Sequence, residues 1–456
     1  MFEDTIAAIA TPLGAGGLAV LRVSGPRACA VADRCFVPAG RHALLPSAAP
    51  THTLHYGHIV AAGRRVDEVM LAVMRAPRTF TREDVVEISC HGGVLPARLV
   101  LDALLAAGAR AAEPGEFTRR AFVNGRIDLT QAEAVADVIH SRTELALAAA
   151  NEQLAGHLSR RIEQLRADLL HVLAHVEAHI DFPDEDISPA TRTVLLDRLD
   201  RGLALTDELL RTAPEGQLLR RGVRAAIIGR PNSGKSSLLN QLLGHNRAIV
   251  SPVAGTTRDT IEETANIRGV PVVFIDTAGL RAAGDEIEAE GIRRSRAALQ
   301  QAELVLHVCD GGEPLHPGDT ALFAEFAHKR RVLVRNKADQ PARWDWPAEL
   351  TGPRVATCCV TGAGIAELKD AIKALVWRGE VGAGMDQVMI NARHQDALLR
   401  ARAGIERTAA ALRAGLPLEL PALDLRLAVG AVGEIVGRTS TEDLLDAIFS
   451  QFCIGK

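Results

Sequence analysis

The sequence predicts a multidomain protein of mixed class: an N-terminal α/β domain, then an all-α helical domain that is interrupted by a second α/β domain. Three observations support this prediction. Short apolar runs alternate with turns in the first part of the chain, and apolar residues then recur at helical spacing. Further along, short apolar strands alternate with helical segments. With 456 residues, the chain has room for about three domains of roughly 150 residues each.

The first part of the chain, residues 1–118, is predicted to be a compact α/β domain. Its expected strands are Ile6 to Ala10, Leu18 to Val23 and Val85 to Ser89, with glycine-rich turns at Gly14 to Gly17 and His91 to Gly93. Each expected strand is short and rich in β-branched or aliphatic residues, which suits a half-buried sheet.

Residues 119–216 are predicted to form the first part of the helical domain. Apolar side chains recur every three or four positions from Leu129 to Ile180, and charges occupy the face between them. Phe182-Pro183 should end this run, because proline disfavours helix at the residue before it. A further helix is expected from about Thr191 to Leu210, followed by a linker at 214–216.

Residues 217–378 are predicted to form the inserted α/β domain, with a parallel sheet covered by helices. Its expected strands are Val223 to Ile228, Val272 to Ile275, Leu304 to Val308, Val332 to Val334 and Val355 to Cys359. Residues 379–456 begin with a glycine-rich stretch, return to helix near His394, and end in a helix with a predicted capping box formed by Thr439 and Glu442. We expect the helical stretches on either side of the insertion to pack together.

Composition restricts the kinds of partner. The chain is 47% hydrophobic and 24% charged with a net charge of −4, so counterion release alone would not hold RNA. RNA would need a local basic patch or a partner protein, and the alternative is no direct RNA contact.

Seven cysteines, with no C-x-x-C pair, argue against a disulfide framework or zinc site and favour a reducing cytosol. With no signal peptide and no apolar run near 20 residues, the prediction is a soluble, cytoplasmic protein without membrane contact.

One motif predicts a phosphate site. The run from Gly229 to Ser236 reads G-x-x-x-x-G-K-S and stands between an expected strand and an expected helix. Its glycines let backbone N–H groups converge on phosphate oxygens. Lys235 supplies positive charge to the β- and γ-phosphates, and the Ser236 hydroxyl can ligate Mg²⁺.

Three further motifs follow in the order of a Ras-like P-loop GTPase. Thr256 and Thr257 offer hydroxyls on a loop, and Thr257 would complete the Mg²⁺ shell. Asp276-Thr277-Ala278-Gly279 follows a strand, so Asp276 would bind the metal through water and the Gly279 N–H would contact the γ-phosphate.

The next motif predicts the base. In Asn336-Lys337-Ala338-Asp339, the Asp339 carboxylate can accept hydrogen bonds from the ring N–H and amine of guanine, a pattern that adenine lacks. The substrate is therefore predicted to be GTP rather than ATP. The fifth element, often Ser-Ala-Lys, is here degenerate, with Cys358 and Cys359.

The expected hydrolytic machinery is incomplete. Leu280 stands where Ras-like enzymes have a glutamine that orients water, and no arginine finger is obvious. Arg281 is adjacent, but we interpret it as a charged side chain on a solvent-exposed loop rather than as an arginine finger. The acidic loop from Asp285 to Glu288 could carry the missing group.

Together these residues resemble the tRNA-modification GTPase family MnmE, also called TrmE, over essentially the whole chain. Motifs outside the nucleotide domain carry the resemblance, because generic GTPases lack them. They are Asp4-Thr5-Ile6, Ala10-Thr11-Pro12, Leu21-Arg22-Val23-Ser24-Gly25, Glu83-Asp84-Val85, His91-Gly92-Gly93, Pro114-Gly115-Glu116-Phe117, Arg120-Ala121-Phe122, Gln131-Ala132-Glu133-Ala134, Asp181-Phe182-Pro183-Asp184-Glu185 and the final Phe452-Cys453-Ile454-Gly455-Lys456.

The resemblance implies a folate-binding N-terminal domain that dimerises, and a G domain activated by K⁺-dependent pairing across the homodimer. Its implied folate contacts, for 5-formyl- or methylene-tetrahydrofolate, are Arg22, Glu87, Arg126 and Lys456. The implied K⁺ ligands are Asn232, Ser251 (commonly threonine), Val253 and Thr256, and Glu288 would orient the attacking water indirectly. With the FAD-dependent partner MnmG, in a heterotetramer, family members place an aminomethyl or carboxymethylaminomethyl group on C5 of the wobble uridine of certain tRNAs.

The expected nucleotide site combines catalytic residues, Mg²⁺ ligands and GTP contacts. Lys235 and Glu288 are the catalytic candidates, and Ser236 and Thr257 are the Mg²⁺ ligands. The expected GTP contacts are Asn232, Ser233, Gly234, Lys235, Ser236, Ser237, Ser251, Thr256, Thr257, Asp276, Thr277, Ala278, Gly279, Asn336, Lys337, Asp339 and Cys359.

Some alternatives stay open at this point. Cys453 is either a nucleophile near the folate or a small residue that closes the end of the chain. The whole chain could instead be a ribosome-assembly GTPase that acts as a binding switch, or a folate aminomethyltransferase with a regulatory GTPase. How hydrolysis couples to uridine chemistry, which tRNAs are chosen and which folate form is bound do not follow from the sequence.

Overall fold

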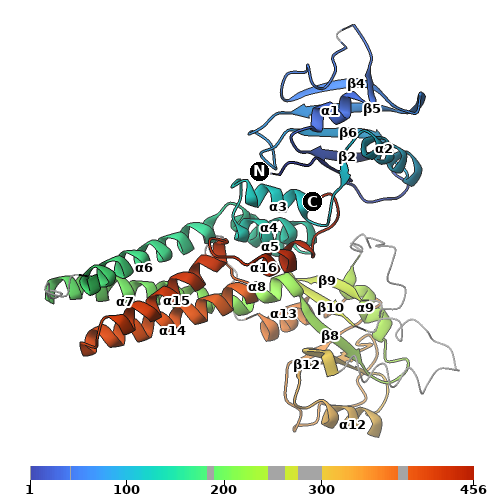
Figure 1. Ribbon diagram of the computed structural model, residues 1–456. Coiled ribbons are helices and arrows are strands. Elements are labelled where there is room, and N and C mark those ends of the chain that lie inside the picture. Colours follow the sequence, from blue (N-terminus) through green and yellow to red (C-terminus); the bar gives the residue numbers. More distant parts are fainter. Residues whose placement is uncertain (1, 42, 182–188, 245–261, 276–299, 378–388) are drawn as a thin grey trace. The chain divides into compact units, whose positions relative to one another are not determined.

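The computed structural model describes residues 2–41, 43–181, 189–244, 262–275, 300–377 and 389–456 (Figure 1). The chain divides into two compact units. The first comprises residues 1–136, 154–202 and 400–456, and the second comprises residues 137–153 and 203–399. Each unit is therefore assembled from segments that are distant in the sequence.

The first unit contains a seven-stranded sheet with the order β3-β4-β5-β6-β2-β1-β7. Neighbouring strands are antiparallel except β1 and β7, which are parallel. The strands are β1 (Ile6–Ile9), β2 (Leu18–Ser24), β3 (Phe36–Pro38), β4 (Thr53–Ala61), β5 (Arg64–Met74), β6 (Val85–His91) and β7 (Arg110–Ala111), with helices α1 (Ala28–Asp33) and α2 (Val94–Ala106). The three strands predicted here are confirmed as β1, β2 and β6.

The sequence analysis missed the longest hairpin of this sheet, β4–β5. Its two strands are joined by Ala62 and Gly63, which both have positive φ angles, of 50° and 75°. Two consecutive residues with positive φ form the tight turn that matches the twist of paired strands. The turn was not recognised in the sequence because its first position is alanine, where asparagine or aspartate is usual.

The helices outside the nucleotide domain are α3 (Glu116–Val123), α4 (Leu129–His140), α5 (Glu144–Leu154), α6 (His157–Asp181), α7 (Pro189–Arg211), α14 (Ala392–Ala414), α15 (Glu419–Val436) and α16 (Glu442–Phe449). The helical spacing expected from Leu129 to Ile180 is confirmed, and it is divided over three helices, α4, α5 and α6. Gly156 has a φ of +82° and separates α5 from α6, and the Thr143 hydroxyl accepts the Ala146 N–H at the start of α5. A left-handed glycine ends a helix whatever the apolar spacing around it.

Within the first unit, helices from before and after the insertion do pack together, as expected. In α6, Leu165 lies against Gly202 of α7, which also approaches Ile405 of α14. Helix α15 packs on α6, where Glu177 accepts from Arg426 at 2.8 Å. These helices lie alongside one another in Figure 1. Residues more than 200 positions apart thus share one core.

Two local predictions were wrong. The linker expected at residues 214–216 lies inside helix α8 (Ala213–Arg221), because Pro214 occupies the first turn, where a missing N–H costs little. The cap of α16 is Thr441 rather than Thr439: the Thr441 hydroxyl accepts from the Leu444 N–H at 3.4 Å, whereas the Thr439 hydroxyl donates to the Gly430 carbonyl.

The second unit is built on a six-stranded sheet with the order β13-β12-β11-β8-β10-β9. Five strands are parallel, and β9 runs antiparallel to β10 at the edge. The strands are β8 (Val223–Ile228), β9 (Glu263–Ile267), β10 (Val270–Phe274), β11 (Leu304–Asp310), β12 (Arg330–Asn336) and β13 (Arg354–Ala356); the helices include α9 (Lys235–Leu243), α12 (Pro317–Glu325) and α13 (Ile365–Val376). This is the predicted parallel sheet of a Ras-like P-loop domain.

The structure changes the edges of that sheet. Strand β9 was not predicted, and the last expected strand is shorter, since β13 ends at Ala356 and the chain turns at Thr357, whose carbonyl accepts from the Ala338 N–H. The expected glycine-rich stretch from Gly379 to Gly384 lies outside the described residues. Among the helices that the structure describes, none is long and apolar enough to cross a membrane.

Candidate nucleotide site

The phosphate loop connects β8 to α9. Gly234, with a φ of +92°, is the residue at which α9 begins, so the first N–H groups of that helix face the loop. A helix N-terminus with free N–H groups and a partial positive charge is a ready anion site. Asn232 also has a positive φ, 59°, and is exposed at the tip of the loop.

Lys235 curls back over this loop. Its Nζ donates to the Arg230 carbonyl at 2.8 Å, and burial lowers the pKa of the Lys235 ammonium. The binding of an anion such as a phosphate would stabilise this partly desolvated ammonium, because opposite charges attract more strongly where water is excluded. Ser233 is buried and its hydroxyl has no hydrogen-bond partner among the described residues. Ser236 and Ser237, in the first turn of α9, are exposed.

The base loop lies at the carboxyl end of β12, beside the phosphate loop. Asn336 is the last residue of β12 and is buried; its Nδ2 donates to the Ser233 carbonyl at 2.9 Å. A Cβ built on Gly234 would lie only 2.0 Å from that Nδ2. The structure therefore brings the predicted phosphate and base motifs into direct contact. Asp339, three residues on, is exposed, and its Oδ1 accepts from the Cys358 thiol at 3.2 Å.

Three functional contacts were missed by the sequence analysis. Lys337, which has a φ of 62°, donates to Asp310 at 2.5 Å, and Asp310 ends β11 directly opposite Asn336. Gln241 of α9 donates to the Cys359 carbonyl at 2.7 Å, and the Thr357 hydroxyl donates to Asn336 Oδ1 at 3.2 Å. An aspartate followed by two glycines at a strand's carboxyl end was the available signal for Asp310.

Several predicted site residues lie outside the described residues. They are Ser251, Val253, Thr256, Thr257, Asp276, Thr277, Ala278, Gly279, Leu280, Arg281 and Glu288. Their proposed roles in binding Mg²⁺ and K⁺, in contacting the γ-phosphate and in orienting water stay predictions.

Replacing Gly234 with alanine is expected to weaken GTP binding by at least about tenfold. The added Cβ would collide with the Asn336 amide and would hold a side chain at a positive φ, which costs about 1 kcal/mol or more on its own. Isothermal titration of wild type and variant with a non-hydrolysable GTP analogue measures the change. Gly244→Ala is the control, because its Cβ would meet no described atom within 4 Å although its φ is also positive. Equal affinities for Gly234→Ala and wild type would contradict the contact.

The residues implied as folate contacts are connected to one another through Phe117 and Phe80. Arg22 and Glu87 are paired across β2 and β6, with Arg22 Nε donating to Glu87 Oε1 at 2.8 Å, and the Arg22 guanidinium lies over the Phe117 ring at 5.7 Å. The Phe117 N–H donates to the Lys456 carbonyl. Arg126 lies over Phe80, which belongs to the same apolar cluster as Phe117.

Cys453 is exposed, and its carbonyl accepts from the Gly115 N–H. The neighbouring Ile454 pairs with Pro114 in an isolated β-bridge. The last residues of the chain are thus tied by backbone hydrogen bonds to the start of α3, and the side chain of Cys453 remains open to solvent.

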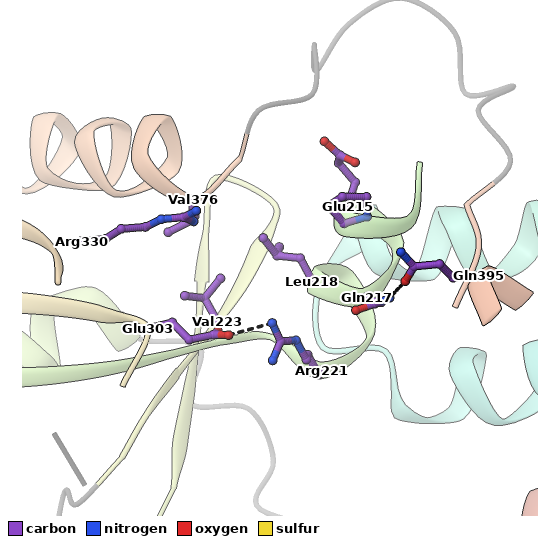
Figure 2. A pocket seen from close by; sticks show the side chains of 10 residues that line it. Glu215, Gln217, Leu218, Arg221, Val223, Glu303, Arg330, Val376 and Gln395 are labelled. Carbon is purple, nitrogen blue, oxygen red and sulfur yellow. Dashed lines mark hydrogen bonds and ion pairs between the residues drawn. The ribbon is translucent and has the colours of Figure 1, made fainter. Parts of the chain in front are cut away.

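A cavity of about 500 Å³ lies in the second unit, lined in part by the first residues of β8 and β12 (Figure 2). Its walls come from strand beginnings, from α8, from the end of α13 and from the start of α14, and two polar contacts join lining residues. Arg221 donates to Glu303 at 2.7 Å, and Gln217 donates to Gln395 at 2.7 Å. Because the carboxyl ends of the parallel strands hold the phosphate and base loops, this cavity is separate from the nucleotide site.

Comparison with known proteins identifies the family. Residues 5–126 match the family described as GTP-binding protein TrmE N-terminus, and residues 129–453 match the MnmE helical domain. The tRNA modification GTPase MnmE of Geobacter metallireducens is 49% identical over 458 residues, covering 100% of this chain and 99% of that protein. The chain belongs to the MnmE family. The MnmE of Geobacillus kaustophilus is 48% identical over 461 residues, with 99% of each chain covered.

Membership of the MnmE family makes the chain a GTPase, in agreement with the arrangement of the phosphate and base loops. Among solved structures, the G domain of the T. maritima FeoB iron transporter is 28% identical and covers 34% of this chain and 98% of that chain, with a TM-score of 0.27.

Proposed function

We propose that this GTPase modifies tRNA: with a flavoprotein partner of the MnmG type, which brings FAD, it adds an aminomethyl or carboxymethylaminomethyl group to C5 of the wobble uridine of certain tRNAs. The observation that supports this proposal most strongly is the full-length similarity to proteins named tRNA modification GTPase MnmE. The chain would act in the cytoplasm as a homodimer and would contact tRNA through the complex.

The nucleotide domain would hold GTP with groups already in place. The N–H groups at the start of α9 and the Lys235 ammonium would bind the phosphates, and the Ser236 hydroxyl would ligate Mg²⁺. Asp339 would accept from guanine's ring N–H and amine, while Asn336 holds the base loop against the phosphate loop. A bound Mg²⁺ neutralises charge on the phosphate oxygens.

The first unit would bind a tetrahydrofolate as the one-carbon donor. The site combines the Glu87 carboxylate, which can accept from an amino-pterin ring, with cations at Arg22, Arg126 and Lys456, which suit the carboxylates of a folate tail. The rings of Phe80 and Phe117 lie beneath two of these guanidinium groups. A planar heterocycle with an anionic tail fits this mixture of aromatic, acidic and basic groups.

Mass analysis of wobble uridines tests the proposal. In a strain that lacks this gene, the modified C5 substituent is expected to disappear from the affected tRNAs and to return when the gene is restored. A copy carrying Asp339→Asn should restore it poorly. Unaltered wobble uridines in the deletion strain would overturn the proposed function and leave the GTPase without a tRNA role.

GTP hydrolysis is expected to be much faster in K⁺ than in Na⁺. Asn232 is exposed at the tip of the phosphate loop, where a K⁺ would supply the positive charge that an arginine finger supplies elsewhere. Steady-state phosphate release at equal ionic strength in KCl and NaCl measures the effect. Asn232→Ala should abolish the difference between the two salts while GTP affinity changes little. Equal rates in both salts for the wild type would refute the cation assignment.

A further inference from the structure

The cavity in the second unit combines an apolar wall with charged side chains (Figure 2). Its volume of about 500 Å³ lies within the range of sites that hold small molecules. The apolar wall consists of Pro214, Leu218, Val223 and Val376. A cavity of this size, with both kinds of surface, can hold a small molecule that has an apolar middle and polar ends.

Two of the four charged side chains on the described cavity wall neutralise each other. Arg221 donates to Glu303 at 2.7 Å, and Glu303 also accepts from the Arg224 N–H at 3.4 Å. The side-chain amides of Gln217 and Gln395 are likewise joined by a hydrogen bond of 2.7 Å. A ligand would gain little at these four side chains, because it would first have to break the contacts that they make with one another.

The other two charged side chains on the wall are Glu215 and Arg330, which have opposite signs. Among the residues that the structure describes, neither side chain has a hydrogen bond or an ion pair. Glu215 Oε2 is also shielded from solvent, which costs free energy that a hydrogen-bond donor would recover.

Glu215 and Arg330 do not meet each other, because they lie on different sides of Leu218 in Figure 2. The last torsion of a glutamate side chain is broad and two-fold, so either oxygen of the Glu215 carboxylate can turn toward the cavity. One bound molecule could therefore contact the carboxylate at one of its ends and the guanidinium at the other.

We propose that this cavity binds a small zwitterion, in which an ammonium group and a carboxylate are joined by a short apolar linker. The ammonium would donate to Glu215, the ligand's carboxylate would accept from Arg330, and the linker would pack on Leu218 and Val376. The charge of the wall favours such a ligand: two carboxylates and two guanidinium groups sum to zero, so a molecule without net charge leaves no charge unpaired in the cavity. The proposal is independent of the proposed tRNA function.

Titration of the full-length protein with ω-amino acids, from β-alanine to 6-aminohexanoate, tests the proposal by calorimetry or saturation-transfer NMR. At least one member of the series is expected to bind with a Kd below about 10 mM. The alkanoate and the alkylamine of the same chain length should each bind about fivefold more weakly or less, because each lacks one of the two charge-assisted contacts. The absence of binding by every member at about 10 mM, or equal binding of the zwitterion and both singly charged analogues, would overturn the proposal.

Substitutions show whether the bound molecule lies in the cavity. Glu215→Gln and Arg330→Gln are each expected to weaken binding by about fivefold or more, since each removes one charged partner. Glu349→Gln and Arg343→Gln are the matched controls, because these exposed side chains belong to the same unit and do not line the described cavity wall. Unchanged GTP affinity in all four variants would show that the nucleotide domain is folded. Equal ligand affinity in the cavity variants and the wild type would place the ligand elsewhere and overturn the assignment.

Discussion

Replacing Lys235 with alanine is expected to lower the rate of GTP hydrolysis by about two to three orders of magnitude, the scale seen when one preorganised group that stabilises transition-state charge is removed. The ammonium is already desolvated in the phosphate loop, which lowers its pKa, and among the described residues it donates to one carbonyl, that of Arg230. Little reorganisation is therefore needed when the phosphates bind, so most of its interaction energy is available to them.

Phosphate release under saturating GTP measures this loss, and titration with a fluorescent GTP analogue separates binding from chemistry. Lys369→Ala is the control, since Lys369 is a partly exposed lysine of α13, on another element of the same unit. Lys235→Ala should retain the folded sheet by circular dichroism. Hydrolysis within threefold of wild type in Lys235→Ala would mean that another group supplies the charge.

Replacing Arg120 with methionine is expected to lower the free energy of unfolding of the first unit by about 3–5 kcal/mol, the usual cost of leaving buried charges without their partner. Arg120 is completely buried and donates to three carboxylates. These are Asp4 at 2.7 Å, Glu116 at 2.9 Å and Glu83 at 3.2 Å. Glu83 and Glu116 are themselves buried, so methionine would leave negative charges in a poorly solvated site.

Urea unfolding followed by hydrogen exchange of peptides from the first unit measures the change. Arg65→Met is the control, because Arg65 makes an exposed ion pair with Glu68, and such pairs contribute about 1 kcal/mol or less. A loss below 1 kcal/mol in Arg120→Met would show that water or a neighbouring cation, such as Arg110, compensates.

The same cluster makes stability depend on pH. Burial raises the pKa of Glu116, but hydrogen bonds from Arg110, from the Glu113 N–H and from Arg120 outweigh it and leave the pKa below its usual 4.5. A carboxylate with a depressed pKa in the folded state contributes stability above the unfolded pKa and loses it as the pH falls through the folded value. Wild type should therefore lose this contribution below about pH 4.5, and Arg120→Met should show a weaker loss over that range.

The phosphate and base motifs could be predicted from the sequence because each occupies consecutive residues at the carboxyl end of a strand, β8 or β12. Periodicity also located β1, β2, β6 and the parallel strands. What it missed depends on contacts between distant residues. Nothing near Lys337 in the sequence points to Asp310, and the pairing arises from the register of β11 with β12. Likewise, apolar spacing continues through Gly156, where the backbone turns left-handed and divides the helices.

The helix pair α6 and α15 also sets the order in which this protein can fold while it is being made. The apolar face of α6, including Leu158, Leu169 and Val176, is buried in the finished protein, but α15 follows it by more than 230 residues. At about 5–20 residues per second, the ribosome needs roughly ten to fifty seconds to supply that partner. The strands of the nucleotide domain, from β8 to β13, are all made before α15. The packing of α6 on α15 therefore cannot form until synthesis is nearly finished.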